Sequence, residues 1–229
     1  MTIVAIDGPA ASGKGTLARR IAETLGFAWL DTGLLYRAAG MGAVEAGDDP
    51  ADPEAAEKAA RTLAERIAAE GPQMLQNPDF RGDRAADAAS RLSAVAGARA
   101  ALLAFQRDFA NAPRTTDGRA LPGAVLDGRD IGTIVCPDAD VKLFVTADVE
   151  ERARRRVKEL QGRGLAAIYQ AVLEDLKQRD ARDSQRAVAP LKPAAGALLL
   201  DTSALDADQA LAAALQAIRS VLPNLVPRS

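Results

Sequence analysis

The chain of 229 residues contains no histidine and a single cysteine, Cys136. The absence of histidine excludes Ser-His-Asp and Cys-His catalysis, imidazole general bases and histidine metal sites. One cysteine excludes a disulfide framework and a cysteine zinc cluster, and it is typical of a reducing compartment. We expect Cys136 to be a small buried hydrophobe rather than a nucleophile. Any chemistry must therefore use carboxylates, lysine, arginine, hydroxyls, backbone amides or a bound cation.

Aromatic residues are also scarce, at 3%, whereas 51 residues are alanine, so much of the apolar share of 48% is small and helix-favouring. The chain has 29 basic and 31 acidic residues and lacks the basic excess of a general nucleic-acid binder. No run approaches the ~20 apolar residues of a membrane span, and the N-terminus lacks the features of a signal peptide. We expect a cytoplasmic monomer with no membrane and no nucleic-acid polymer as partner.

Short apolar runs alternate along the chain with segments of helical periodicity. The predicted strands are residues 2–7, 27–30, 124–127, 141–146 and 197–200. The predicted helices include residues 13–25, 33–46, 54–70, 81–92, 97–109, 166–179 and 206–222. This alternation predicts a three-layer α/β fold with a five-stranded parallel sheet. We expect one domain over residues 1–224, because residues 225–229 resemble most of a thrombin-cleavage linker and are interpreted as an appended tail.

One segment follows the first strand and opens the first helix: Gly8-Pro9-Ala10-Ala11-Ser12-Gly13-Lys14-Gly15-Thr16. That context and spacing are typical of a phosphate-binding P-loop. Its glycines let backbone amides point at phosphate oxygens, and Lys14 reaches the β- and γ-phosphates of ATP. The hydroxyl that usually follows the lysine is replaced by Gly15, and Thr16 comes one residue later. We expect the whole segment to bind ATP and Lys14 to be catalytic.

The sequence Gly-Lys-Gly-Thr is the P-loop variant of nucleoside monophosphate kinases, and three further stretches resemble bacterial cytidylate kinases. They are Leu30–Arg37 (LDTGLLYR), Leu126–Thr133 (LDGRDIGT) and Arg179–Leu191 (RDARDSQRAVAPL). The resemblance spans about residues 2–222. It implies a P-loop kinase fold with a helical substrate-binding segment at about 33–110 and a short lid at about 150–165. It also implies Mg²⁺-dependent transfer of the ATP γ-phosphoryl group to CMP or dCMP, in pyrimidine nucleotide metabolism.

Asp127 ends an apolar strand, at the edge where such folds place reacting phosphates. By resemblance it holds Mg²⁺ through water, which would compensate for the missing hydroxyl at Gly15. The other interpretation of Asp127 is an ordinary turn or helix-capping aspartate.

The resemblance further implies an acceptor site rich in arginine. Two highly charged nucleotides must meet, and a guanidinium fork binds two phosphate oxygens at once. The implied contacts are Arg37, Arg129 and Arg186 for the acceptor phosphate, Arg179 and Asp183 for the sugar hydroxyls, and Thr32, Asp130 and Arg99 for cytosine. Arg129 and Arg186 are also candidates for catalysis.

A second basic cluster lies before and between two glycines, Gly162 and Gly164. It consists of Arg152, Arg154, Arg155, Arg156, Lys158 and Arg163. One interpretation is a mobile lid whose cations cover the ATP phosphates, with Arg155 as the candidate contact. The other is a solvated helix face paired with Glu151 and Glu159.

Two features depart from the family pattern. Thr32 stands where the family often has serine, which keeps the hydroxyl. Ala68–Asp79 lacks the alternation of the small antiparallel sheet that many members carry there, so we expect a shortened substrate-binding insert.

Two alternative functions remain open. One is another small-molecule P-loop kinase of UMP/CMP type. The other is a nucleotide-binding switch module, although the chain has no Asn-Lys-x-Asp guanine reader. A protein kinase is excluded, because protein kinases have a different glycine-rich loop and their catalytic motifs are missing from this sequence.

Overall fold

The computed structural model describes residues 1–115 and 117–225. The chain divides into two compact units. The first consists of Met1–Leu30, Ala110–Gln185 and Ala189–Ser229, and the second of Asp31–Phe109 and Arg186–Val188. Of the predicted tail, residues 226–229 lie outside the described residues.

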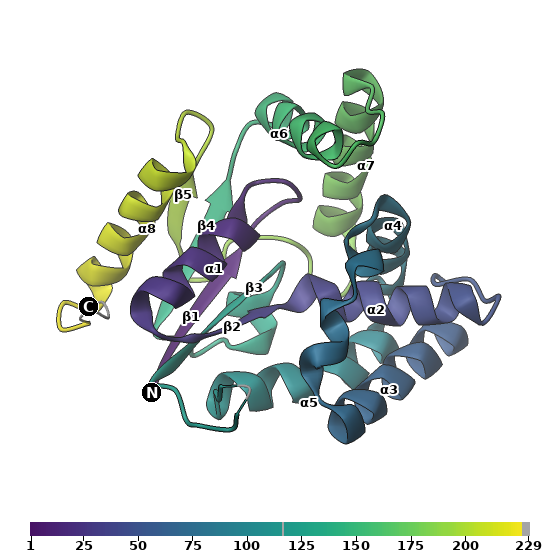
Figure 1. Cartoon of the computed structure of the whole chain (residues 1–229), viewed down its shortest axis with the longest axis horizontal. Helices are drawn as coiled ribbons and strands as arrows, with labels where there is room; N and C mark the ends of the chain where they lie inside the picture. The colour runs from purple at the N-terminus through teal and green to yellow at the C-terminus, as the bar shows by residue number, and fades with distance from the viewer. Residues whose placement is uncertain (116, 226–229) are drawn as a thin grey trace. The chain divides into compact units, whose positions relative to one another are not determined.

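A five-stranded sheet organises the first unit (Figure 1). Its strands are β1 (Thr2–Asp7), β2 (Ala28–Asp31), β3 (Gly123–Gly128), β4 (Val141–Thr146) and β5 (Leu198–Asp201). The order is β2-β3-β1-β4-β5, and β1 pairs in parallel with both β3 and β4. The predicted parallel α/β fold is confirmed.

The register of the sheet brings four strand ends to one edge. Asp7 of β1 pairs with Gly128 of β3 and with Phe144 of β4, and Thr146 pairs with Asp201 of β5. The segments that follow β1, β3, β4 and β5 therefore leave the sheet at the same carboxyl edge. This is the edge at which parallel sheets bind ligands.

Four long helices lie in the described residues of the first unit. They are α1 (Lys14–Leu25), α6 (Val149–Gly162), α7 (Tyr169–Gln185) and α8 (Ala207–Val221). Helices α1 and α8 lie side by side against the sheet, as Figure 1 shows, and their apolar faces share one core with β1, β3 and β4. That core includes Ile6, Ile21, Leu143 and Ile218, which are almost completely buried. Burial of these large side chains holds the sheet edge in place.

The second unit is helical. It contains α2 (Thr32–Glu45), α3 (Pro53–Glu70), α4 (Asp83–Leu92) and most of α5 (Ala96–Asn111). Its core combines leucines with alanines such as Ala56 and Ala60. Helices α2 and α4 approach each other closely at Gly40. A Cβ at this position would lie only 2.8 Å from the carbonyl carbon of Ala88.

The segment between α3 and α4 forms two 3₁₀ turns, Pro72–Gln76 and Pro78–Arg81, rather than strands. The expected lack of sheet in 68–79 is confirmed. Leu75 of the first turn is buried in the core of the second unit, so this short insert is anchored by its own apolar side chain.

Two details differ from the sequence prediction. A π-helical turn, Ile131–Val135, follows β3 and was not predicted. Helix α7 runs to Gln185, six residues beyond the predicted end at Arg179. Its buried face continues from Leu173 and Leu176 to Asp183, and this change from apolar to charged residues conceals the helix from an analysis of hydrophobic periodicity.

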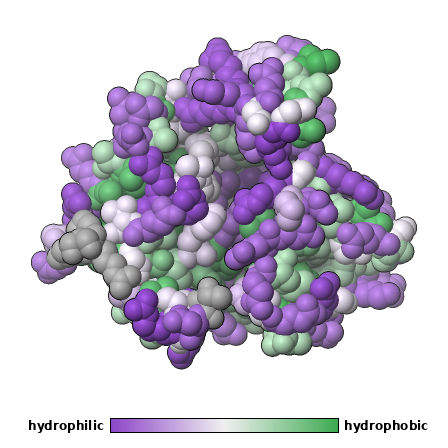
Figure 2. Space-filling model, viewed as in Figure 1, coloured by the Kyte–Doolittle hydropathy of each residue, from purple (hydrophilic) through white to green (hydrophobic). Residues whose placement is uncertain are grey.

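Within the described ranges, no single helix is long and apolar enough to cross a membrane, although the bent pair α4–α5 passes that test jointly by length and composition. Cys136 is buried, as expected. The loop that joins α6 to α7 exposes Leu165 and Ile168, and Figure 2 shows hydrophobic residues at this end of the two helices.

Candidate active site

The loop between β1 and α1 has a backbone conformation that suits few residues. Gly8 has a φ of 157°, and a Cβ there would lie 2.0 Å from the carbonyl oxygen of Val145. Gly13 has a φ of 83°, and Ala11 has a φ of 58° even though it carries a Cβ. A left-handed conformation costs a non-glycine residue about 1–2 kcal/mol. Such strain persists where the surroundings impose it, typically at functional sites.

Ser12 adds a second sign of ligand binding to this loop. Its hydroxyl oxygen is buried and has no hydrogen-bond partner in the part of the chain that the structure describes. An unsatisfied buried polar atom costs about 1–3 kcal/mol, and it indicates a ligand that supplies the missing bond. Lys14 begins α1, where the first-turn amides carry partial positive charge. The predicted P-loop therefore has the geometry of an anion-binding site.

Asp127 lies next to this loop. Its carboxylate is buried, and the indole nitrogen of Trp29 donates a 2.9 Å hydrogen bond to Oδ1. The other oxygen, Oδ2, would lie 3.5 Å from a Cβ on Gly15. Asp127 therefore lies close to the P-loop at Gly15, whereas its role in holding Mg²⁺ stays a prediction. Trp29 was not singled out in the sequence, where it appears only as an apolar strand residue.

Asp7, at the end of β1, is hydrogen-bonded to the segment that follows β3. Its carboxylate accepts hydrogen bonds from the backbone amides of Ile131 (2.7 Å) and Gly132 (2.8 Å). Burial raises the pKa of Asp7 to about 6, the two amides oppose that rise, and the nearby charge of Asp130 adds to it. The positive charge of Lys14 lowers the pKa of Asp7. Asp7 thus positions the Asp130 turn relative to the P-loop.

Two predicted arginines of the first unit lie beside one predicted carboxylate. Arg129 donates to Asp183 at 2.8 Å, and burial opposes its charge while Asp183 raises its pKa. Arg179 is mostly buried as well, and burial together with the charge of Arg129 lowers its pKa. Arg179 also forms an ion pair with Asp175 of the same helix at 3.7 Å. Each of these two neighbouring guanidinium groups thus has a carboxylate partner that offsets the repulsion between them.

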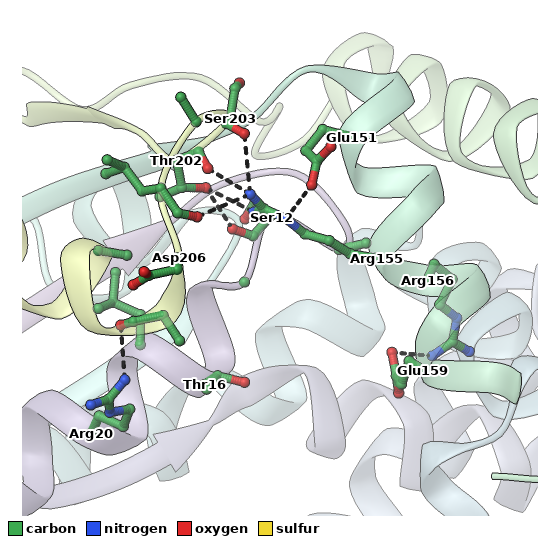
Figure 3. A pocket seen from close by; sticks show the side chains of 17 residues that line it. Ser12, Thr16, Arg20, Glu151, Arg155, Arg156, Glu159, Thr202, Ser203 and Asp206 are labelled. Carbon is green, nitrogen blue, oxygen red and sulfur yellow. Dashed lines mark hydrogen bonds and ion pairs between the residues drawn. The ribbon is translucent and has the colours of Figure 1, made fainter. Parts of the chain in front are cut away.

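A cavity of about 680 Å³ opens beside the P-loop (Figure 3). It is lined by parts of the P-loop, α1, α6 and the segment after β5, including Ser12, Thr16, Arg155, Thr202 and Ser203. Its size is in the range of small-molecule sites. The segment after β5 was missed in the sequence, although a polar run directly after a parallel strand is a signal for this edge.

Arg155 points into this cavity and is held by its neighbours, as Figure 3 shows. It donates to the backbone oxygen (2.6 Å) and the hydroxyl (3.2 Å) of Thr202 and to Glu151 (3.2 Å). Its terminal nitrogen would lie 3.9 Å from a Cβ on Gly13. The candidate lid arginine is therefore close to the P-loop, whereas its contact with ATP stays a prediction.

The other charges on α6 divide into two groups. Arg154, Arg156 and Arg163 form ion pairs with Glu151 or Glu159, as expected for a paired helix face. Arg152 differs, because it is only 5% exposed and faces the interior. For Arg152, the interpretation as part of a solvated helix face is therefore wrong.

The predicted residues of the second unit lie on several of its elements. Thr32 is buried at the start of α2, and Arg37 of the same helix donates to the backbone oxygen of Phe80 at 3.1 Å. Arg99 of α5 lies over the ring of Tyr36, 5.3 Å from its centroid. An aromatic face of this kind stabilises and orients a guanidinium group.

Ser93 connects two of these arginines. Arg99 donates to its backbone oxygen at 3.3 Å, and Arg186 donates to its hydroxyl at 3.3 Å. The hydroxyl of Ser90, one turn earlier, is buried and has no partner in the described residues. Ser90 was missed because a lone serine in an alanine-rich helix gives no sequence signal.

No group of three or more His, Cys, Asp or Glu side chains in the described ranges could hold a metal ion by itself. The residues at Asp127 nevertheless fit a cation that is also bound by phosphate. Trp29 occupies one carboxylate oxygen, while the other faces the P-loop. Hydrated Mg²⁺ with one or two carboxylate contacts and substrate phosphates is the usual arrangement of this ion.

Comparison with known proteins gives a consistent result. A family model described as Cytidylate kinase matches residues 4–220. A cytidylate kinase of Paramagnetospirillum magneticum is 62% identical over 96% of this chain and 98% of its own length. A cytidylate kinase of Rhodospirillum rubrum is 56% identical over 93% of this chain and 95% of its own.

A solved structure supports the fold. The crystal structure of an uncharacterized protein from Eubacterium ventriosum aligns with a TM-score of 0.52 at 16% identity, covering 96% of this chain and 99% of that one. The matches in sequence extend over nearly the whole chain. They include the P-loop and the buried Asp7 and Asp127 beside it. This chain belongs to the cytidylate kinase family.

Proposed function

We propose that this protein transfers the γ-phosphoryl group of ATP to CMP or dCMP, giving CDP or dCDP and ADP. The observation that carries the proposal is the strained P-loop, in a chain of the cytidylate kinase family, with a Ser12 hydroxyl that has no hydrogen-bond partner among the described residues. Phosphoryl transfer of this kind depends on positioning and charge neutralisation, for which the absence of histidine is no obstacle.

The donor nucleotide occupies the P-loop and the adjoining cavity. Residues 8–16 surround its phosphates with backbone amides, and Lys14 neutralises charge on the group that moves. Arg155 lines the cavity and is the candidate contact to ATP. The cavity extends from the P-loop to Thr202 and Ser203, which gives room for the rest of the nucleotide.

Mg²⁺ belongs to this proposal through Asp127. When bound, the ion neutralises phosphate charge and orients the phosphate oxygens. Asp127 would hold the hydrated ion, and Trp29 fixes the orientation of its carboxylate by the hydrogen bond to Oδ1.

The acceptor residues have separate roles in each unit. In the first unit, Arg129 binds the acceptor phosphate, Arg179 and Asp183 bind sugar hydroxyls, and Asp130 accepts from the cytosine amino group. In the second unit, Arg37 and Arg186 bind the phosphate, and Thr32 and Arg99 bind the base. The Ser90 hydroxyl, which has no partner in the part of the chain that the structure describes, is a further candidate for a nucleotide contact in the second unit. We also propose that the protein acts as a monomer.

A turnover panel tests the proposal. Each nucleoside monophosphate is incubated with ATP and Mg²⁺, and ADP formation is measured together with the diphosphate product. We expect CMP and dCMP to react fastest and UMP to be roughly 30- to 1,000-fold slower, because a carboxylate would face the uracil O4. A preference for another monophosphate would support a different small-molecule P-loop kinase. Binding of nucleotide without transfer to any acceptor would support a switch module.

A further inference from the structure

Arg152 has a place that no role in nucleotide binding explains. It lies in the first turn of α6, and its guanidinium group connects three separate segments of the first unit. Nε donates to the backbone oxygen of Ala147 after β4 (2.9 Å), and Nη1 donates to the backbone oxygen of Ala10 in the P-loop (3.1 Å). Both terminal nitrogens also donate to Asp180 of α7, at 3.2 and 2.6 Å.

This arrangement uses properties that only arginine has. The planar fork donates in several fixed directions at once and stays charged when buried. The Arg152 side chain is 6% exposed and that of Asp180 is 26% exposed. Burial of a charge is unfavourable unless it is paired and hydrogen-bonded, which Asp180 and the two backbone oxygens ensure.

The contact with Ala10 acts on the strained part of the P-loop. A trans peptide unit is planar, so its carbonyl and amide point in opposite directions. Because Arg152 holds the oxygen of Ala10, the amide of Ala11 is turned away from Arg152. Ala11 is the residue with the left-handed φ of 58°, so the contact stabilises the very peptide at which the loop is strained.

Helix α7 connects this contact to a second one. Asp180 binds Arg152, and Asp183, one turn further along the helix, binds Arg129 at 2.8 Å. Leu173 and Leu176 of α7 also form a small apolar cluster with Ala10 and Ala153. The two ion pairs use different carboxylates of α7, so a substitution at Arg152 removes its own pair and leaves the pair of Arg129 with Asp183 in place.

We propose that Arg152 is a positioning residue that holds the P-loop in its phosphate-binding conformation, and that Asp180 keeps Arg152 in place. The proposal rests on the function proposed above, since it assigns to Arg152 an effect on ATP affinity. Arg152 contacts neither nucleotide. It acts through the Ala10–Ala11 peptide, so loss of its fork weakens ATP binding selectively and leaves the affinity for CMP almost unchanged.

The test uses the variants Arg152→Lys and Asp180→Asn in the full chain. Dissociation constants for a non-hydrolysable ATP analogue and for CMP are measured by calorimetry, and steady-state kinetics gives kcat and the KM of each substrate. For Arg152→Lys, we expect ATP-analogue affinity to fall roughly 10- to 30-fold and CMP affinity to change less than threefold. Asp180→Asn should give a smaller change of the same kind. The double variant should be no weaker than Arg152→Lys, because the two residues act as one unit.

Arg19→Lys is the matched control, because Arg19 forms an exposed ion pair with Glu23 on α1 and makes none of these contacts. It should bind both nucleotides like the unmodified protein. An unchanged ATP-analogue affinity in folded Arg152→Lys overturns the proposal. So does an equal loss of both affinities, which would show a general structural role.

Should Arg152→Lys fail to fold, Asp180→Asn decides by the same criterion. Failure of the turnover panel leaves this test intact, because binding of the ATP analogue is measured without an acceptor.

Discussion

The two units of this chain use different means to hold their residues in place. The first unit surrounds a parallel sheet with large aliphatic side chains and fixes the sheet edge with buried charges, such as Asp7 and Arg152. The second unit packs helices through small residues, as at Gly40 and Ala88. Alanine is abundant in both, and in the second unit the missing methyl group of Gly40 determines how closely α2 and α4 approach. Function in the first unit should therefore respond mainly to charge, and folding of the second unit mainly to volume.

The largest expected effect concerns charge in the first unit. Lys14→Ala should lower kcat by about three orders of magnitude or more, because Lys14 neutralises charge that develops during transfer. Turnover of CMP is measured alongside circular dichroism to show that the variant is folded. Lys58→Ala, on the exposed surface of α3, serves as the control and should keep its activity. Near-normal turnover in folded Lys14→Ala would contradict the role given to the P-loop.

The next effect depends on pH and tests whether the buried charge of Asp7 is costly. Its pKa is raised from 3.8 to about 6 in the folded state, so the folded protein binds this proton more tightly than the unfolded chain. The stability from this group is thus fully present below pH 3.8 and is lost as pH rises to about 6. We expect the contribution of Asp7 to the free energy of unfolding to fall by about 2–3 kcal/mol over this window.

Urea denaturation at several pH values, compared with Asp7→Asn, measures this term. The difference in stability between the two proteins should change between pH 4 and 6.5 and be constant above that range. A difference that does not vary with pH would mean that the two backbone amides outweigh burial and keep Asp7 ionised.

A smaller effect is expected when side-chain volume is added in the second unit, and a second glycine of α2 provides the control. Gly40→Ala places a methyl group against the backbone of Ala88, so it should destabilise the protein by about 1–3 kcal/mol. Gly42→Ala, two residues along the same helix, meets nothing within 4 Å and should stabilise it by up to about 1 kcal/mol. Urea midpoints for the two variants provide the measurement. Equal effects at the two positions would remove the distinction drawn between the units.

Much of the fold followed from the sequence, because hydrophobic periodicity and glycine stops define elements locally. Helix α1 begins within one residue of its predicted start and ends at Leu25 as predicted. The P-loop was recognisable since its chemistry is encoded in consecutive residues. The end of α7 was missed, because its buried face changes from leucine to aspartate at Asp183.

Long-range partners could not be predicted in the same way. Arg152 belongs to a run of similar arginines, and nothing in that run marks the one that points inward. Its partners, Ala10 and Asp180, are 142 and 28 residues away in sequence. The bond between Trp29 and Asp127 is likewise defined only by strand order. Such contacts depend on which segments the sheet brings to one edge, which local patterns do not specify.

The smallest predicted effect tests whether the first unit reads the base as well as the phosphates. Asp130 is buried beside the π-helical turn, and its carboxylate can accept from the cytosine amino group, whereas it would face the uracil O4 as a second acceptor. Asp130→Asn replaces one oxygen by a donor that can turn toward O4. We expect a lower kcat/KM for CMP and a CMP-over-UMP ratio reduced at least tenfold, or about 1.4 kcal/mol. Asp138→Asn, at an exposed turn, controls for the change of charge. If both substrates lose the same factor, Asp130 does not read the base, and base recognition must then be assigned to other residues such as Thr32 and Arg99 of the second unit.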